Sequence, residues 1–177
     1  MRAEWAPRHV MDLLLTAMMP ENRLAVQVSM ATGLRIGDVL AIKTEQARRG
    51  RFTLTEEKTG KHRRVYLPRE LRERMFAQAG RFYVWEGRND PTKHRTRQAV
   101  YKDLARVAAL YRVEGRKIKA HISTHTGRKV WAVEAYQRTG SLEKVKDLLN
   151  HESEAVTALY ALADILTARA HAGKMEA

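Results

Sequence analysis

The sequence predicts a mainly α-helical fold with one small antiparallel β-hairpin, an α+β arrangement. Apolar residues recur at helical spacing over most of the 177 residues. One stretch near residue 55 instead alternates polar and apolar positions around a Lys-Thr-Gly turn. A chain of this length suits one domain with a sizeable core, so we expect residues 1–177 to form a single domain.

The first third of the chain predicts three helices. Residues 8–19 form an amphipathic helix whose inward face consists of Val10, Leu13, Leu14 and Met18. Pro20 interrupts it, and residues 21–31 form a more uniformly apolar, buried helix. Gly33 then supplies a turn before a third, short helix at residues 35–42.

The middle of the chain predicts the hairpin and another helix. Residues 51–57 and 63–67 form its two strands, because both alternate in polarity and the Lys-Thr-Gly-Lys segment between them forms a turn. A helix begins after Pro68, which is favoured in a first helical turn. Residues 82–85 form a short strand, and a loop follows at 88–94.

The second half of the chain predicts four further helices. Residues 96–111 form an amphipathic helix whose inward face consists of Val100, Leu104, Val107 and Leu110. Residues 124–138 form a helix that Thr139-Gly140 ends, and Ser141 caps a short helix at 142–149. A last helix begins after Ser153 and carries Tyr160.

The charge of the chain predicts a polyanionic partner. Lys and Arg total 33 against 20 Asp and Glu, a net charge of +13, and residues 91–130 hold eleven Lys or Arg but two acids. A concentrated basic face suits phosphate neutralisation, although a basic surface that only keeps the protein in solution is the simpler alternative. The absence of cysteine excludes disulfides and thiolate zinc sites and suits a reducing cytoplasm. No apolar run is long enough to span a bilayer, and the N-terminus does not read as a signal peptide.

Several residues have types and positions that suit chemistry on an anion. Arg35 lies at a helix start, where the helix dipole disfavours a cation, so we expect it to have an anionic partner, and Asp38 is one candidate. Lys58 lies in the hairpin turn, and His125 and Arg128 share one helix face at a spacing of three. Taken singly, each has a simpler explanation: an exposed lysine, a buried structural histidine, and for Tyr160 a half-buried core tyrosine.

A metal site is a weaker alternative. His121 and His125 are four residues apart, which is a ligand spacing, but no cysteine or suitable carboxylate supplies a third ligand. His151-Glu152 begins like a zinc-protease motif, yet position 155 is alanine and the motif fails. We therefore expect neither a metal nor a cofactor.

In combination, these residues resemble the catalytic domain of the tyrosine recombinases, the family that includes the phage integrases. The match begins at Thr32-Gly33-Leu34-Arg35 with Asp38, continues with a lysine in a hairpin turn before Thr-Gly, and includes a His-x-x-Arg element. A second histidine then precedes a tyrosine by nine residues. Two positions depart from the family pattern: Asn150 stands where glycine is usual, and Gly127 where leucine is frequent.

The resemblance implies a tyrosine-recombinase fold and a set of site residues. The catalytic set it implies is Arg35, Lys58, His125, Arg128, His151 and Tyr160. The tyrosine attacks a DNA phosphodiester, the arginines and histidines contact its non-bridging oxygens, and the lysine protonates the leaving 5′-oxygen. Weaker candidates for DNA contact are Lys61, Arg95 and Arg97.

The resemblance also implies partners and assembly. We expect double-stranded DNA as the partner, a mostly monomeric protein in free solution, and a homotetramer on DNA with residues from about 161 to 177 exchanged between protomers. Family members usually carry an N-terminal core-binding domain, which we expect to be absent from residues 1–177, and a prokaryotic or phage origin is implied. Two alternatives share the pattern: a DNA-binding factor without catalysis, and a type IB topoisomerase-like enzyme.

Overall fold

The structure is a computed structural model, and it describes residues 5–113, 116–117 and 121–149. The chain divides into two compact units, residues 1–131 and 132–177. His151, Tyr160 and the predicted exchanged segment lie outside the described residues. The prediction that residues 1–177 form one catalytic domain stays a prediction.

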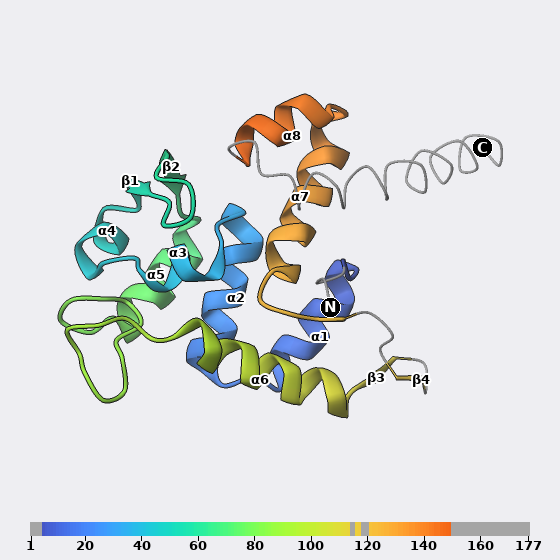
Figure 1. The fold of residues 1–177 in the computed structure, drawn as a ribbon, viewed down its shortest axis with the longest axis horizontal. Coiled ribbons are helices and arrows are strands. Elements are labelled where there is room, and N and C mark those ends of the chain that lie inside the picture. Colours follow the sequence, from blue (N-terminus) through green and yellow to red (C-terminus); the bar gives the residue numbers. More distant parts are fainter. Residues whose placement is uncertain (1–4, 114–115, 118–120, 150–177) are drawn as a thin grey trace. The chain divides into compact units, whose positions relative to one another are not determined.

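The first unit is mainly helical, as the sequence predicts (Figure 1). Its elements in chain order are α1 (Arg8–Thr16), α2 (Pro20–Thr32), α3 (Ile36–Leu40), α4 (Thr44–Arg49), β1 (Arg51–Thr55), β2 (His62–Tyr66), α5 (Arg69–Gln78), α6 (Arg97–Leu110), β3 (Arg112–Val113), β4 (Arg116–Lys117) and the first turns of α7 (Thr126–Thr139). The remainder of α7, from Ala132, and α8 (Leu142–Leu148) belong to the second unit.

Helix α2 is the centre of the first unit. It packs against α1, α3, α5 and α6, which is why its apolar residues are not confined to one stripe. Pro20 occupies its first turn, where the missing N–H is not needed. It ends at Gly33, whose φ of 68° is in the left-handed region, and the Gly33 N–H donates to the carbonyl of Ser29 at 2.8 Å.

Strands β1 and β2 form the predicted antiparallel hairpin. Arg51 pairs with Tyr66 at its open end and Thr55 with His62 near the turn. Leu54 and Val65 are buried, because alternate residues of each strand face the protein. Glu56 follows Leu54 at the next inward position and is fully buried, although it lies just beyond the strand.

A buried polar network joins α2 to α6. Asp103 accepts hydrogen bonds from the backbone N–H of Met19 and from Asn22 Nδ2, both at 2.9 Å, and from Arg106 at 2.7 Å. Burial alone would raise the pKa of Asp103, but these hydrogen bonds outweigh it and hold the pKa below its ordinary value. The network fixes the middle of α6 against the start of α2.

Three sequence predictions about local structure are wrong. Residues 82–85 form no strand: Tyr83 makes only an isolated bridge with Lys43, and a second isolated bridge joins Glu86 and His94 just beyond them. Leu13 and Leu110 were expected to face inward but are 40% and 67% exposed. At the end of α6 Tyr111 takes the inward place, packing against the core with its hydroxyl 3.3 Å from Thr16 Oγ1.

The described part of the second unit follows the predicted pattern closely. Gly140, with a φ of 62°, follows α7, and the Ser141 side chain accepts a hydrogen bond from the Lys144 N–H at 3.3 Å to cap α8. Val145 and Leu149 are buried. Among the helices of the described residues, none combines the length and hydrophobicity that crossing a membrane requires.

Candidate active site

Arg35 lies directly before α3, at the residue that caps its N-terminus. Only 7% of it is exposed, and its Nη1 donates to Glu56 Oε2 at 2.9 Å. Asp38 Oδ2 lies 3.7 Å from the same nitrogen. Two carboxylates therefore offset the unfavourable position of a cation at a helix start, as the sequence predicts for Asp38. Glu56, the closer of the two, comes from the hairpin.

Glu56 is the anion that several groups of the site share. Its Oε2 accepts from Arg35 and from Thr59 Oγ1, both at 2.9 Å, and its Oε1 lies 3.4 Å from Arg63 Nη1. Burial alone would raise the pKa of Glu56. The hydrogen bonds from Arg35 and Thr59, with the charges of Arg35 and Arg128, outweigh it, so the pKa lies below the ordinary 4.5. Glu56 is thus a buried, ionised group that joins the hairpin to α3.

Arg63 ties β2 to the turn between α2 and α3. Its Nη2 donates to the carbonyl of Thr32 at 2.7 Å, and its Nη1 lies 3.4 Å from the carbonyl of Gly33. Its guanidinium also lies 5.7 Å from the ring centre of Trp131 on α7. Arg63 therefore holds the backbone that immediately precedes Arg35.

Arg128 reaches the same turn from α7. It is only 2% exposed, and its Nη1 donates a short hydrogen bond to the carbonyl of Gly33. Gly33 must be glycine here for two reasons. Its φ is positive, and a Cβ would lie 2.6 Å from the ring of Trp131. The close approach lets the first turn of α7 pack on this turn, and Arg128 therefore lies against the segment that precedes Arg35.

Asp38 has an environment opposite to that of Glu56. Its Oδ1 accepts from the backbone N–H of Glu57 at 2.9 Å, and Arg35 and Arg128 lie close enough to favour its charge. Burial outweighs these contacts, with a smaller contribution from the negative charge of Glu56, and raises the pKa of Asp38 above its ordinary value. The cluster therefore contains three guanidiniums and two carboxylates, and the pKa is lowered for Glu56 and raised for Asp38.

Lys58 lies where the sequence places it, in the hairpin turn, and is exposed. The turn is closed by the Gly60 N–H, which donates to the carbonyl of Glu56 at 2.8 Å, and by the Glu56 N–H, which donates to Lys61 at 2.9 Å. Glu56 thus both closes the hairpin turn through its backbone and holds Arg35 through its side chain. The position of Lys58 is coupled to that of Arg35 through one buried side chain.

His125 lies in the turn that leads into α7, half-buried, and its backbone N–H donates to Ser123 Oγ at 3.2 Å. With the start of α6 it borders a hollow of about 350 Å³, whose lining residues are Arg97, Gln98, Tyr101, His121, Ser123, Thr124 and His125. Arg97 is exposed at this hollow. Arg95, by contrast, donates from Nε to Asn22 Oδ1 at 2.8 Å and so contacts the network at α2.

The glycine at position 127 has a packing reason. A Cβ there would lie 3.3 Å from Met30 Cγ and 3.4 Å from Ser29 Oγ, so α7 approaches α2 closely at its first turn. Within the described residues, no group of three or more His, Asp and Glu side chains is arranged to hold a metal ion.

The sequence analysis missed Glu56 and Arg63. A pattern for both was present, because Glu56 and Arg63 occupy inward positions of the alternation that buries Leu54 and Val65. A charged residue on the inward face of a strand requires a partner. Glu56 and Arg63 partner each other across the hairpin, seven residues apart, but their shorter contacts are to Arg35 and the Thr32 carbonyl, 21 and 31 residues distant, and local spacing could not name those.

Comparison with known proteins gives three kinds of match. The profile described as Phage integrase family matches residues 5–165. The Bacillus subtilis (strain 168) protein named "Probable integrase/recombinase YoeC" is 28% identical over 148 residues, which are 78% of this chain and 76% of that protein.

Solved structures share the fold. The XerH site-specific recombinase in its post-cleavage complex with palindromic difH is 19% identical, with a TM-score of 0.69, and the match covers 98% of this chain and 54% of that one. A lambda integrase dimer bound to a COC′ core site is 18% identical, with a TM-score of 0.68, covering 89% and 48%. The catalytic domain of bacteriophage HP1 integrase is 19% identical, with a TM-score of 0.59, covering 90% and 86%. This chain thus spans about half the length of the XerH and lambda chains.

Proposed function

The chain belongs to the phage integrase family, and on that premise we propose that it cleaves and rejoins DNA strands through a 3′-phosphotyrosyl intermediate on Tyr160. The observation that carries the proposal is the placement of Arg35 and Arg128. Both are buried and both are fixed to one short segment, Arg35 by its position in the chain and Arg128 by its bond to Gly33. Two fixed guanidiniums suit the non-bridging oxygens of a phosphodiester.

The chemistry follows from these positions. The Tyr160 oxygen attacks the scissile phosphorus and loses its proton to a base, for which His125 and His151 are the candidates. A bond from phosphorus to the tyrosine oxygen forms as the bond to the 5′-oxygen breaks. Lys58 protonates that leaving oxygen, and Arg35 and Arg128 stabilise the charge on the two non-bridging oxygens. Attack by a 5′-hydroxyl reverses the step, so the bond energy is retained and no nucleotide cofactor is required.

The exposed Lys58 suits the role of general acid. It stands on a turn whose base is anchored beside Arg35 by Glu56, so a substrate phosphate held by the arginines would lie near the lysine. Lys61, in the same turn, and Arg97, at the hollow beside His125, are proposed to contact the DNA backbone on either side. Arg95 contacts Asn22, so we propose for it a weaker, indirect part.

Assembly is proposed by analogy with relatives. One solved structure of lambda integrase is a tetramer bound to a Holliday junction. We propose that this chain is mostly monomeric in free solution and forms a homotetramer on double-stranded DNA, with residues from about 161 to 177 exchanged between protomers.

A covalent-capture experiment tests the assignment. The protein is incubated with a nicked suicide duplex, whose cleavage releases a short fragment and prevents religation, and adducts are separated on a denaturing gel. Wild type and the control Tyr136→Phe should form the adduct, whereas Tyr160→Phe should not. Arg35→Gln should slow adduct formation by about 10²–10³-fold, because one preorganised donor is lost. An adduct with Tyr160→Phe would refute the assignment of Tyr160 as nucleophile. The absence of an adduct with wild type on every candidate duplex would refute the cleavage itself and leave the DNA-binding factor without catalysis.

A further inference from the structure

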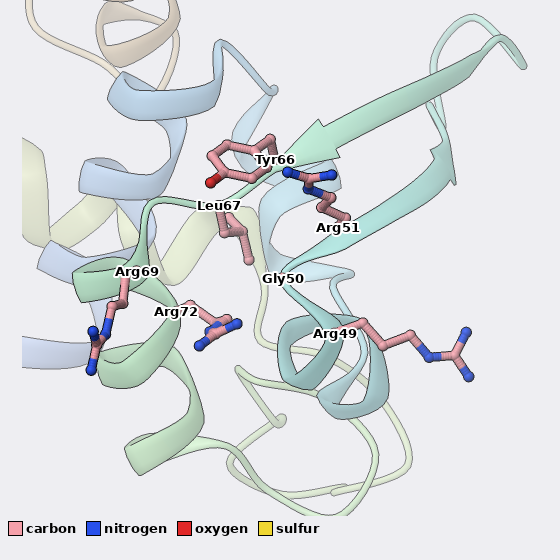
Figure 2. Close-up of a pocket in the computed structure, with 7 residues that line it drawn as sticks. All are labelled: Arg49, Gly50, Arg51, Tyr66, Leu67, Arg69 and Arg72. Carbon is pink, nitrogen blue, oxygen red and sulfur yellow. The ribbon is translucent and has the colours of Figure 1, made fainter.

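A second concentration of arginines lies at the open end of the hairpin, away from the turn that carries Lys58. It borders a hollow of about 280 Å³ (Figure 2). The lining residues, which we call the basal pocket, are Arg49, Gly50, Arg51, Tyr66, Leu67, Arg69 and Arg72. No acidic side chain is among them. The basal pocket has no part in the chemistry proposed above.

The backbone of Gly50 shapes the basal pocket. Its φ of 69° turns the chain directly from α4 into β1, and its carbonyl accepts from the Leu67 N–H at 3.0 Å. A Cβ at this position would lie 2.8 Å from Arg72 Cδ and 3.2 Å from Arg72 Nη1, so the glycine lets Arg72 lie across the turn. In Figure 2 Arg72 extends from α5 toward Gly50, whereas Arg49 and Arg69 extend away from it in opposite directions.

The charges of the basal pocket are largely uncompensated. Arg69 pairs with Glu73 at 2.8 Å, but in the described part of the chain no acidic side chain forms an ion pair with Arg49, Arg51 or Arg72. Arg51 lies over the ring of Tyr66, 5.1 Å from its centre, which fixes its direction. Arg72 is half-buried and so has lost part of its hydration, and within the described residues its only carboxylate interaction is a weak one with the charge of Glu73, which already pairs with Arg69. An anion bound between Arg51 and Arg72 would supply a direct partner.

A basic strip leads from the basal pocket to the Lys58 turn. The outward positions of the hairpin, which are all exposed, include Arg51, Arg64 and His62 and no acid, and Lys61 follows in the turn. From Arg51 to Thr55 the strand spans about 14 Å, which corresponds to roughly four base pairs of DNA. The strip therefore has the length and charge to follow a stretch of phosphate backbone.

We propose that Arg51 and Arg72 bind a backbone phosphate of duplex DNA, several base pairs from the phosphate that reacts. The inference rests on the proposed function, which makes DNA the substrate. Forked guanidiniums address two phosphate oxygens at once, which lysines do not. The contact adds affinity and sets the direction of the duplex along the hairpin, and it reads no base sequence.

The salt dependence of DNA binding tests this contact. The dissociation constant of a fluorescent duplex is measured by anisotropy between about 50 and 200 mM salt for three proteins: wild type, Arg51→Gln/Arg72→Gln, and the control Arg8→Gln/Arg48→Gln. The control removes the same charge from arginines that pair with Asp12 and Glu45. Loss of one phosphate contact should lower the slope of log K against log salt by about 1 in the basal-pocket variant. The control should keep the wild-type slope.

The outcomes separate this inference from the proposed function. If wild type forms the Tyr160 adduct but the basal-pocket variant keeps the wild-type slope, the basal pocket does not bind DNA, and an acidic protein segment becomes the better occupant. If the slope falls but no adduct ever forms, the inference stands and the catalytic assignment fails. A titration of wild type with inorganic phosphate tests the remaining source: saturable binding that Arg51→Gln/Arg72→Gln removes, together with an unchanged DNA slope, overturns the assignment to DNA. Arg51→Gln alone, at an exposed position, repeats the measurement should the double variant not fold.

Discussion

Replacing Glu56 by glutamine tests the organisation of the whole site. The two side chains have the same shape, but the amide carries no charge and presents a donor where one carboxylate oxygen accepts. Oε2 accepts from Arg35 and Thr59, and Oε1 faces Arg63, so either orientation of the amide directs an N–H group at an N–H or O–H donor. Removing one member of a buried ion pair costs about 3–5 kcal/mol, and here two arginines lose their common partner.

The assay is denaturant unfolding of wild type, Glu56→Gln and Glu57→Gln at neutral pH. Glu57→Gln is a matched control, since this exposed residue lies in the same turn and contacts Asp38 through its backbone N–H. We expect Glu56→Gln to lose about 3–5 kcal/mol, a fall in Tm of roughly 6–20 °C, and Glu57→Gln to lose less than about 0.5 kcal/mol. Covalent capture on the suicide duplex should slow in parallel for Glu56→Gln, because Arg35 is no longer held. A loss below about 1 kcal/mol, or equal losses in both variants, would refute the view that Glu56 organises the site.

Three further predictions follow from the same cluster. Because the folded pKa of Glu56 is lowered, wild type should lose stability as the pH falls below about 4.5. Glu56→Gln should flatten this loss in acid unfolding curves, and an equally steep curve in the variant would contradict the assignment. Because the folded pKa of Asp38 is raised, its ionisation costs stability as the pH rises above 3.8, so the stability of Asp38→Asn relative to wild type should increase with pH in the same curves. Gly33→Ala should lose about 2–5 kcal/mol in denaturant unfolding, since it forces an L-residue into a left-handed conformation and a Cβ against Trp131; a loss under about 1 kcal/mol would show that the turn adapts.

Much of the fold was predictable because its helices have strong apolar periodicity and its hairpin has a clear turn sequence. The segment that became α4 shows the limit. Among its six residues only Ala47 is buried, so the sequence has no apolar stripe from which this helix could be predicted. The helix exists because of its surroundings: Gly50 lets the chain turn into β1, and α5 packs alongside. Its local signal is limited to the cap, where the Lys43 N–H donates to Gln46 Oε1 at 2.9 Å, and a helix this short also depends on tertiary contacts.

The candidate site was predictable to a different degree. Arg35, Lys58, His125 and Arg128 were proposed from their order along the chain, and their roles stay predictions. The structure places Arg35 and Arg128 against one turn. The anion beneath them was not identified. Asp38 was visible as a local partner of Arg35, but the shorter contact comes from Glu56, whose role depends on how the hairpin packs against α3. His151 and Tyr160 stay predictions from the sequence.

The two carboxylates of the site hold three arginines in position, and their negative charge is smaller than the positive charge of those arginines. Fixing guanidiniums in a buried place requires a counter-ion, yet a fully neutralised cluster would attract a phosphate weakly. Glu56, whose pKa is lowered, supplies one negative charge that persists to lower pH than that of an ordinary glutamate. The pKa of Asp38 is raised, in part because the negative charge of Glu56 makes a second negative charge nearby unfavourable. An approaching phosphate adds negative charge to the same place and strengthens that effect. The cluster therefore keeps at least one positive charge in excess for the phosphate, and its carboxylates serve to position arginines whose charge remains available to DNA.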